Sequence, residues 1–143
     1  MDKNPPIIAE KIHLQKIEVV QTRMDLGRFK ESKKHALTLG HKLLHNLDEN
    51  RIKLELLFSF KDVKEEEFLF MQIDFHFQID NLSDFYTLDD HENPVFLGSA
   101  IGTLLAIAVS TSRGVIFEKL ESNGISNIII PVMNPNKLLQ ESQ

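Results

Sequence analysis

The sequence predicts an α+β fold, in which four antiparallel strands form a sheet and one long helix packs on it. Three observations support this prediction. Between residues 12 and 79, four stretches place apolar residues at every second position, which is the period of a half-buried β-strand. A run without charged residues follows from Val95 to Ser112, and its apolar residues recur at helical spacing. No repeat or linker divides the 143 residues, so we expect a single domain over residues 1–143 with a flexible lead-in at 1–10.

The composition fits a folded domain and narrows its chemistry. The chain is 42% hydrophobic and 26% charged, has a formal charge of −5 and contains no cysteine. The lack of cysteine excludes disulfides, thiol nucleophiles and thiolate-bound metals. The acidic balance disfavours general nucleic-acid binding, because phosphates require clustered Lys and Arg. The N-terminus has no apolar signal-peptide core, and polar residues and glycines interrupt the run from 95 to 112. We therefore expect a cytoplasmic protein with no membrane insertion.

The first two strands are indicated by alternating side chains. Over residues 12–20 the apolar positions change from even to odd around Lys16, which predicts a β-bulge. Residues 35–47 fit either a loose helical stripe or a strand. We favour the strand, because every odd position is Leu or His and Gly40 would cost a helix about 1 kcal/mol.

Residues 52–60 and 69–79 predict two further strands, so that the four strands form a meander-like sheet. Asp48 to Asn50 is typical of a tight turn, and residues 61–66 of a charged turn. Leu57, Phe68 and Phe70 point away from the core set of their strands, which predicts apolar surface on the second face of the sheet.

The long helix has a start and a stop signal. Asn93 is a favourable N-cap and Pro94 suits the first helical position, while Gly124 suits the C-terminal end. Beyond it we expect a short extended segment at 128–131 and a final helical turn at 136–140. The apolar stripe of the helix consists of Leu97, Ile101, Leu104, Leu105 and Ala108.

No residue pattern indicates catalysis or a cofactor. The sequence has no nucleophile elbow, zinc-protease motif or phosphate-binding loop. His41 and His45 would share one helix face, but on a strand they lie about 13 Å apart, too far to hold one metal ion. We therefore predict no catalytic residues, no metal site and no cofactor.

Small residues recur every fourth position along the helix at Gly98, Gly102 and Ala106. They could pack against the domain's own sheet. We favour an oligomer interface, because the apolar stripe already supplies a sheet-facing surface and the small face leaves room for a second backbone.

Three stretches, in this order, resemble the bacterial SecB export chaperone family. Residues 12–17, Ile-His-Leu-Gln-Lys-Ile, are similar to the family's first strand. The sequence Ser112-Arg113-Gly114 is similar to the Arg-Gly pair of its long helix. Residues 130–135, Ile-Pro-Val-Met-Asn-Pro, followed by Leu138 and Leu139, resemble its closing segment. The resemblance covers about residues 11–140.

The resemblance implies a dimer of dimers, a homotetramer, that holds unfolded or pre-export polypeptides without ATP in long apolar grooves. Such a site needs broad and adaptable apolar surface, since its clients share hydrophobicity rather than sequence. The positions that match the groove, and that we predict to bind clients, are Met24, Leu26 and Phe29 in the loop and Leu37 and Leu39 in the second strand.

A Sec translocation motor is a further partner that the resemblance implies. However, Met71 and Gln72 lie near the place where the family carries the acidic docking surface, and the stretch after Arg113 and Gly114 is longer than in the family. Related chaperones of this fold serve toxin–antitoxin pairs. The alternative is therefore a SecB-fold scaffold dedicated to one partner, such as an antitoxin.

Overall fold

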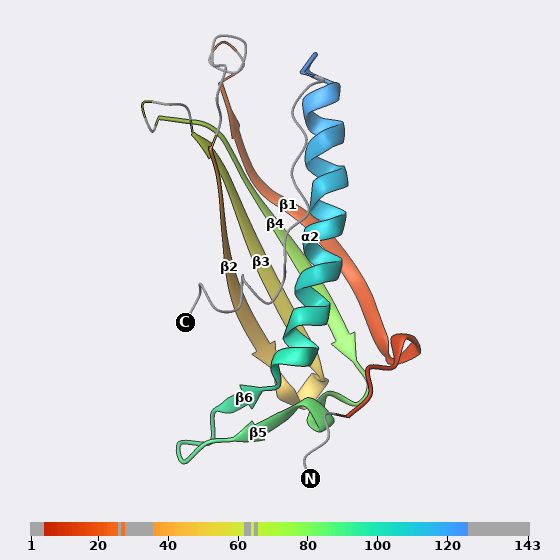
Figure 1. Cartoon of the computed structure of the whole chain (residues 1–143). Helices are drawn as coiled ribbons and strands as arrows, with labels where there is room; N and C mark the ends of the chain where they lie inside the picture. Colours follow the sequence, from red (N-terminus) through yellow and green to blue (C-terminus); the bar gives the residue numbers. More distant parts are fainter. Residues whose placement is uncertain (1–4, 26, 28–35, 62–63, 65, 126–143) are drawn as a thin grey trace.

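The computed structural model describes residues 5–25, 27, 36–61, 64 and 66–125, and it confirms the α+β prediction. Four long strands and one long helix make up the body of the fold, with a small hairpin before the helix (Figure 1). The strands of the main sheet are β1 (Ile12–Met24), β2 (Ala36–Asn46), β3 (Arg51–Lys61) and β4 (Glu67–Ile79). The remaining elements are β5 (Tyr86–Leu88), β6 (Pro94–Phe96), the helix α2 (Gly98–Glu121), and three 3-10 turns, η1 (Ala9–Lys11), η2 (Leu47–Glu49) and η3 (Leu82–Phe85).

The strand order of the main sheet is β1-β4-β3-β2, with every neighbouring pair antiparallel. β2, β3 and β4 follow one another as predicted, and β2 and β3 are joined at η2, where Asn50 adopts the left-handed conformation with φ 56°. The expected simple meander is wrong for β1, which pairs with β4 rather than with β2. This pairing aligns Ile12 with Ile79 and Met24 with Leu69, so the apolar rows of both strands match.

β1 contains the predicted bulge and a second one. The register shifts between Leu14 and Lys16, and again between Val19 and Gln21. Each extra residue exchanges the two faces of the strand. The apolar side chains therefore stay on the helix side along the whole strand, at even positions first, then at odd positions, and at even positions again near Met24.

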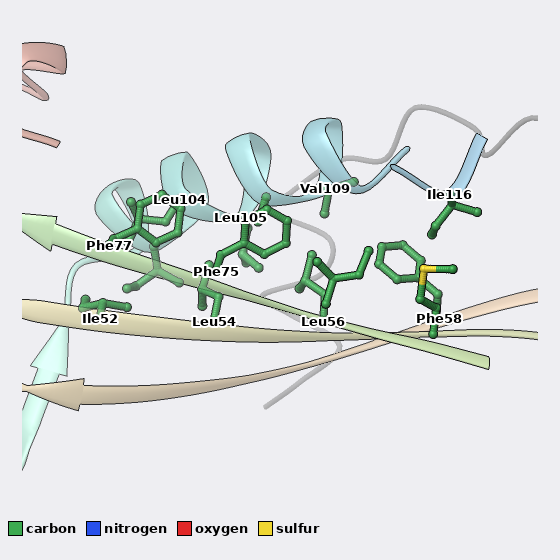
Figure 2. Close-up of a cluster of buried hydrophobic side chains, with 14 of the residues drawn as sticks. Ile52, Leu54, Leu56, Phe58, Phe75, Phe77, Leu104, Leu105, Val109 and Ile116 are labelled. Carbon is green, nitrogen blue, oxygen red and sulfur yellow. The ribbon is translucent and has the colours of Figure 1, made fainter. Parts of the chain in front are cut away.

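The core lies between α2 and the two central strands. Figure 2 shows α2 side chains from Leu104 to Ile116 packed over the even positions of β3 and the odd positions of β4. The two edge strands contain no fully buried residue. A helix is about 10 Å wide and strands lie about 4.8 Å apart, so one helix covers about two of four strands. Consequently β1 and β2 keep apolar side chains that α2 covers only in part.

α2 begins later than Asn93 and Pro94 predict. Pro94 is the first residue of β6 and pairs with Leu88, while Asn93 lies in the hairpin turn, where its N–H donates to Asp89 Oδ1 at 2.8 Å. The helix starts at Gly98 after Leu97, which provides no side-chain cap. The N-cap signal is thus used for a hairpin turn, because the carboxylate of Asp89 satisfies the backbone N–H groups of His91 and Asn93.

The predicted C-terminal glycine is confirmed. Gly124 has φ +80°, its N–H donates to Glu121 O, and the N–H of Ile125 donates to Leu120 O at 2.9 Å. These two hydrogen bonds form a Schellman motif, and the buried side chains of Ile125 and Leu120 supply its apolar contact. The segments predicted at 128–131 and 136–140 lie outside the described residues.

Phe68 does not face away from the core as its position in the alternation predicted. The register between β3 and β4 shifts beside Phe60 and Lys61, which turns Phe68 inward to 2% exposure and brings its ring 6.2 Å from that of Phe60. Phe70 and Leu57 do lie on the second face, where both are half-buried. The apolar surface of that face is therefore smaller than the sequence predicted.

α2 is also long and apolar enough to cross a membrane. Half of its most apolar window is buried inside the chain, as in the core helix of a globular domain. This agrees with the prediction that one long helix packs on the sheet.

Candidate functional site

The helix-side face of β2 carries a row of half-buried leucines, which we call the β2 row: Leu37, Leu39 and Leu43. They lie opposite Phe60, Phe58 and Leu54 of β3, so one side of each leucine packs on the core. β2 is an edge strand, and within the described residues no further strand pairs with its other side. Burying a leucine side chain completely is favourable by about 1.5–3 kcal/mol relative to leaving it exposed. Because the leucines of the β2 row are only half-buried, a ligand that covered them would gain about 1 kcal/mol for each leucine.

Two of the predicted client-binding residues, Leu37 and Leu39, belong to the β2 row. Met24 lies at the opposite edge of the sheet, at the end of β1, where it is half-buried and packs against the core. Leu26 and Phe29 lie outside the described residues. The structure thus brings Leu37 and Leu39 together and places Met24 apart from them.

A second apolar row lies on β1 and was not predicted from the sequence. Leu14, Ile17 and Val19, which we call the β1 row, face the helix side and are 39–49% exposed. The alternation of β1 alone does not show that these three side chains share a face. Both bulges must be known to predict it. The sequence indicates the bulge at Lys16, but Val20 and Gln21 give no signal for the second.

The three small residues of α2 differ in exposure. Gly98 is exposed, and a methyl group placed on it would meet nothing within 4 Å. Ala106 is half-buried, whereas Gly102 is buried within the single chain. The predicted interface between copies therefore has Gly98 and Ala106 as its accessible part, and it stays a prediction.

The opposite face of the sheet carries a polar network between β1, β3 and β4. His76 Nε2 lies 3.1 Å from Glu18 Oε1, and Lys16 Nζ lies 3.5 Å from the same carboxylate. Lys53 Nζ joins Glu55 at 3.2 Å and Asp74 at 3.3 Å. The hydrogen bond with His76, supported by Lys16, lowers the pKa of Glu18. Lys53 has a raised pKa because of its hydrogen bonds, first with Glu55 and then with Asp74. Burial acts in the opposite direction and lowers this pKa.

The same face ends in a second group around Glu67. This carboxylate accepts hydrogen bonds from Ser59 Oγ at 2.7 Å and from Arg23 at 2.9 Å, and both lower its pKa, Ser59 more strongly. The guanidinium of Arg23 also lies 4.3 Å from the ring centre of Phe70. Arg23 therefore covers the apolar side chain that the sequence predicted to be free on this face.

The histidines of β2 do not form a metal site in the part of the chain that the structure describes. His41 and His45 lie on one strand, and the ring of His45 packs 5.8 Å from that of Phe96. Among the described residues, no group of three or more His, Asp or Glu side chains could hold a metal ion. On the helix side of β2 the two histidines therefore alternate with the leucines of the β2 row.

Comparison with known proteins supports the fold only. No family model and no curated protein matches this sequence. Among solved structures, the chain is similar to a SecB-like chaperone of Mycobacterium tuberculosis, Rv1957, in complex with a ChAD peptide from the Rv1956 HigA1 antitoxin. The TM-score is 0.51 at 7% sequence identity, and the match covers 87% of this chain and 91% of the other. The sheet with one long helix is thus a SecB-like fold, as the resemblance predicted.

Proposed function

We propose that this chain binds unfolded or pre-export polypeptides on apolar surface, without ATP and without catalysing a reaction, in the cytoplasm. The observation that carries the proposal is the β2 row, in which leucines at the edge of the described sheet pack on the core and are only partly buried. A protein that binds non-native chains delays their folding and aggregation by stabilising the unfolded state.

The β1 row extends the apolar surface to the other edge of the helix-covered face. Leu14, Ile17 and Val19 are more exposed than a strand packed in a finished core would leave them. An extended client segment can add its own strand to either edge of the described sheet and place alternate side chains on these rows. Backbone pairing is independent of client sequence, which suits a binder of many different polypeptides.

A second candidate function is binding of one dedicated partner. The similar structure holds a peptide from an antitoxin, and this favours an antitoxin segment as the ligand of the same apolar surface here. The two functions differ in the range of ligands and not in the surface they use.

We further propose that the chain assembles as a dimer of dimers through the accessible small residues of α2. Gly98→Leu would place a bulky side chain where a second backbone approaches, whereas Gly114→Leu, at the other exposed glycine of the helix, is the matched control. Light scattering should show a smaller assembly for Gly98→Leu only. An unchanged mass for both variants would contradict this interface.

The proposed function is tested by the range of unrelated polypeptides that the protein binds. Purified protein should suppress the aggregation of several unrelated chemically denatured proteins on dilution, without added nucleotide. Light scattering during dilution measures this directly. Suppression of none of them, together with tight binding of one antitoxin-type peptide, would replace the general function by the dedicated one.

A further inference from the structure

The end of α2 is followed by an asparagine and a glycine, Asn123 and Gly124, and this pair occurs only once in the sequence. An asparagine before a glycine is chemically labile, because the backbone nitrogen of the glycine can attack the side-chain amide of the asparagine. Glycine favours the attack, since it has no side chain to hinder the approach and its backbone turns freely. Both residues are exposed, so water reaches them.

The reaction of this pair needs only water as a second reactant. The nitrogen of Gly124 loses its proton and forms a bond with Cγ of Asn123. The bond from Cγ to Nδ2 then breaks, and the amide nitrogen leaves as ammonia, which takes up the proton. Water opens the resulting cyclic imide at either of its C–N bonds, which gives aspartate or isoaspartate at this position. The net change replaces a neutral amide by a carboxylate.

The folded chain engages both reacting groups in hydrogen bonds. Asn123 Nδ2 donates to Lys119 O at 2.8 Å, and the N–H of Gly124 donates to Glu121 O at 3.0 Å. The attacking nitrogen must give up the proton that Glu121 O accepts, and the side-chain amide must leave Lys119 O to turn toward it. Both hydrogen bonds belong to the end of α2, so the attack requires this end to open.

The apolar contact of the Schellman motif holds the helix end closed. The N–H of Ile125 donates to Leu120 O at 2.9 Å, and both side chains are buried. Helix ends open at a much lower free energy than the whole domain needs to unfold. The frequency of opening therefore depends on the packing of Ile125 more than on the stability of the domain as a whole.

We propose that Asn123 is a modification site controlled by the end of α2: its amide converts to a carboxylate only while the helix end is open, and the carboxylate then favours the open form. A carboxylate has no hydrogen to donate to Lys119 O. Its negative charge also lies at the negative end of the helix dipole. Because ammonia is lost, the change is permanent, and each converted chain keeps a loosened helix end.

The experiment follows the conversion of Asn123 in the full chain by mass spectrometry of its proteolytic peptides, after incubation in mildly alkaline buffer with or without urea. Unfolding in urea should speed the conversion by at least about tenfold, because every helix end is then open. In buffer, Ile125→Ala should speed it severalfold, since it removes the apolar contact. Ile101→Ala, the same change at a similarly buried residue near the start of α2, should leave the rate within about twofold.

Circular dichroism establishes that both variants are folded, and Ile125→Val with Ile101→Val replaces the pair if either unfolds. Equal rates with and without urea, or equal acceleration by both alanine variants, would overturn control by the helix end. In Asn123→Asp, the N–H of Ile125 should exchange with deuterium severalfold faster than in wild type. Equal exchange in both chains would overturn the loosening by the carboxylate. None of these measurements involves a client, so failure here and failure of the proposed function are distinguishable.

Discussion

At the scale of single residues, Ser112 is a polar group that the core leaves unsatisfied. Its side chain is fully buried on the sheet-facing side of α2, and its hydroxyl has no hydrogen-bond partner among the residues that the structure describes. A buried hydroxyl without a partner costs about 1–3 kcal/mol, and alanine also favours a helix over serine. We expect Ser112→Ala to raise the free energy of unfolding by about 1 kcal/mol.

Urea denaturation measures this change, and Ser110→Ala, an exposed position of the same helix, shows the part due to helix propensity. If Ser112→Ala were no more stabilising than Ser110→Ala, the hydroxyl would have a partner, and the packing described here for α2 would be wrong at this point.

The lowered pKa of Glu18 predicts how the stability of the folded chain changes as the pH falls. The hydrogen bond with His76 and the charge of Lys16 hold its pKa below the ordinary value of 4.5. The unfolded chain therefore binds a proton first as the pH falls. The contribution of Glu18 to stability is complete above pH 4.5 and is lost as the pH falls through the lowered pKa of the folded state.

Glu18→Gln should accordingly reduce the fall in Tm between about pH 6 and about pH 3, with Glu10→Gln on η1 as the control. Thermal unfolding followed by circular dichroism measures the profile. Parallel profiles for wild type and Glu18→Gln would show that the contact with His76 does not persist in solution.

At the scale of elements, the exposed glycine inside α2 and the exposed glycine that follows it should respond oppositely to substitution by alanine. Gly124 has φ +80°, a conformation that costs other residues about 1 kcal/mol or more, so Gly124→Ala should destabilise by about that amount. Gly114 lies inside the helix with nothing within 4 Å of an added methyl group, so Gly114→Ala should stabilise by up to about 1 kcal/mol.

Chemical denaturation of both variants provides the measurement. Stabilisation by Gly124→Ala would mean that α2 does not end in the Schellman motif, and destabilisation by Gly114→Ala would mean that Gly114 does not lie on open helix surface. The prediction of Gly124 as the C-terminal signal came from sequence, which shows that helix ends with a glycine in the left-handed region can be recognised without a structure.

Local patterns predicted β2, β3 and β4 well because each has one buried or half-buried face. β3 is the clearest case, since its even positions are buried and its odd positions are not. β2 was identified by the same alternation together with Gly40, although helix and strand were both considered. Period-two patterning therefore sufficed for the type and nearly for the bounds of β2, β3 and β4, whereas the strand predicted at 12–20 ends four residues before the end of β1.

Features that depend on how one strand pairs with another could not be predicted from the alternation within a strand. The inward turn of Phe68 results from a register shift beside Lys61, and the place of β1 next to β4 results from two matching apolar rows. The hairpin of β5 and β6 depends on the carboxylate of Asp89, which competes with helix initiation at Pro94. Tertiary contacts decide these three features, so the local propensity of the residues does not predict them.

At the scale of the whole molecule, one helix on four strands explains where the candidate site lies. α2 covers β3 and β4, and the β1 row and β2 row flank it on the same face. Sequence and resemblance placed Leu37 and Leu39 in the site. The exposure of the β1 row could be found only from the register between β1 and β4.

The central claim, that the β2 row binds non-native polypeptide, is tested most directly by client affinity. Fluorescence anisotropy of a labelled, permanently unfolded polypeptide should show binding about tenfold weaker for Leu37→Asp with Leu39→Asp than for wild type. Thr38→Asp lies between them on the opposite face and should bind as wild type does. Circular dichroism confirms the fold, and the milder Leu37→Ser with Leu39→Ser replaces the double aspartate if it unfolds. Wild-type affinity in a folded variant of this row would contradict the account.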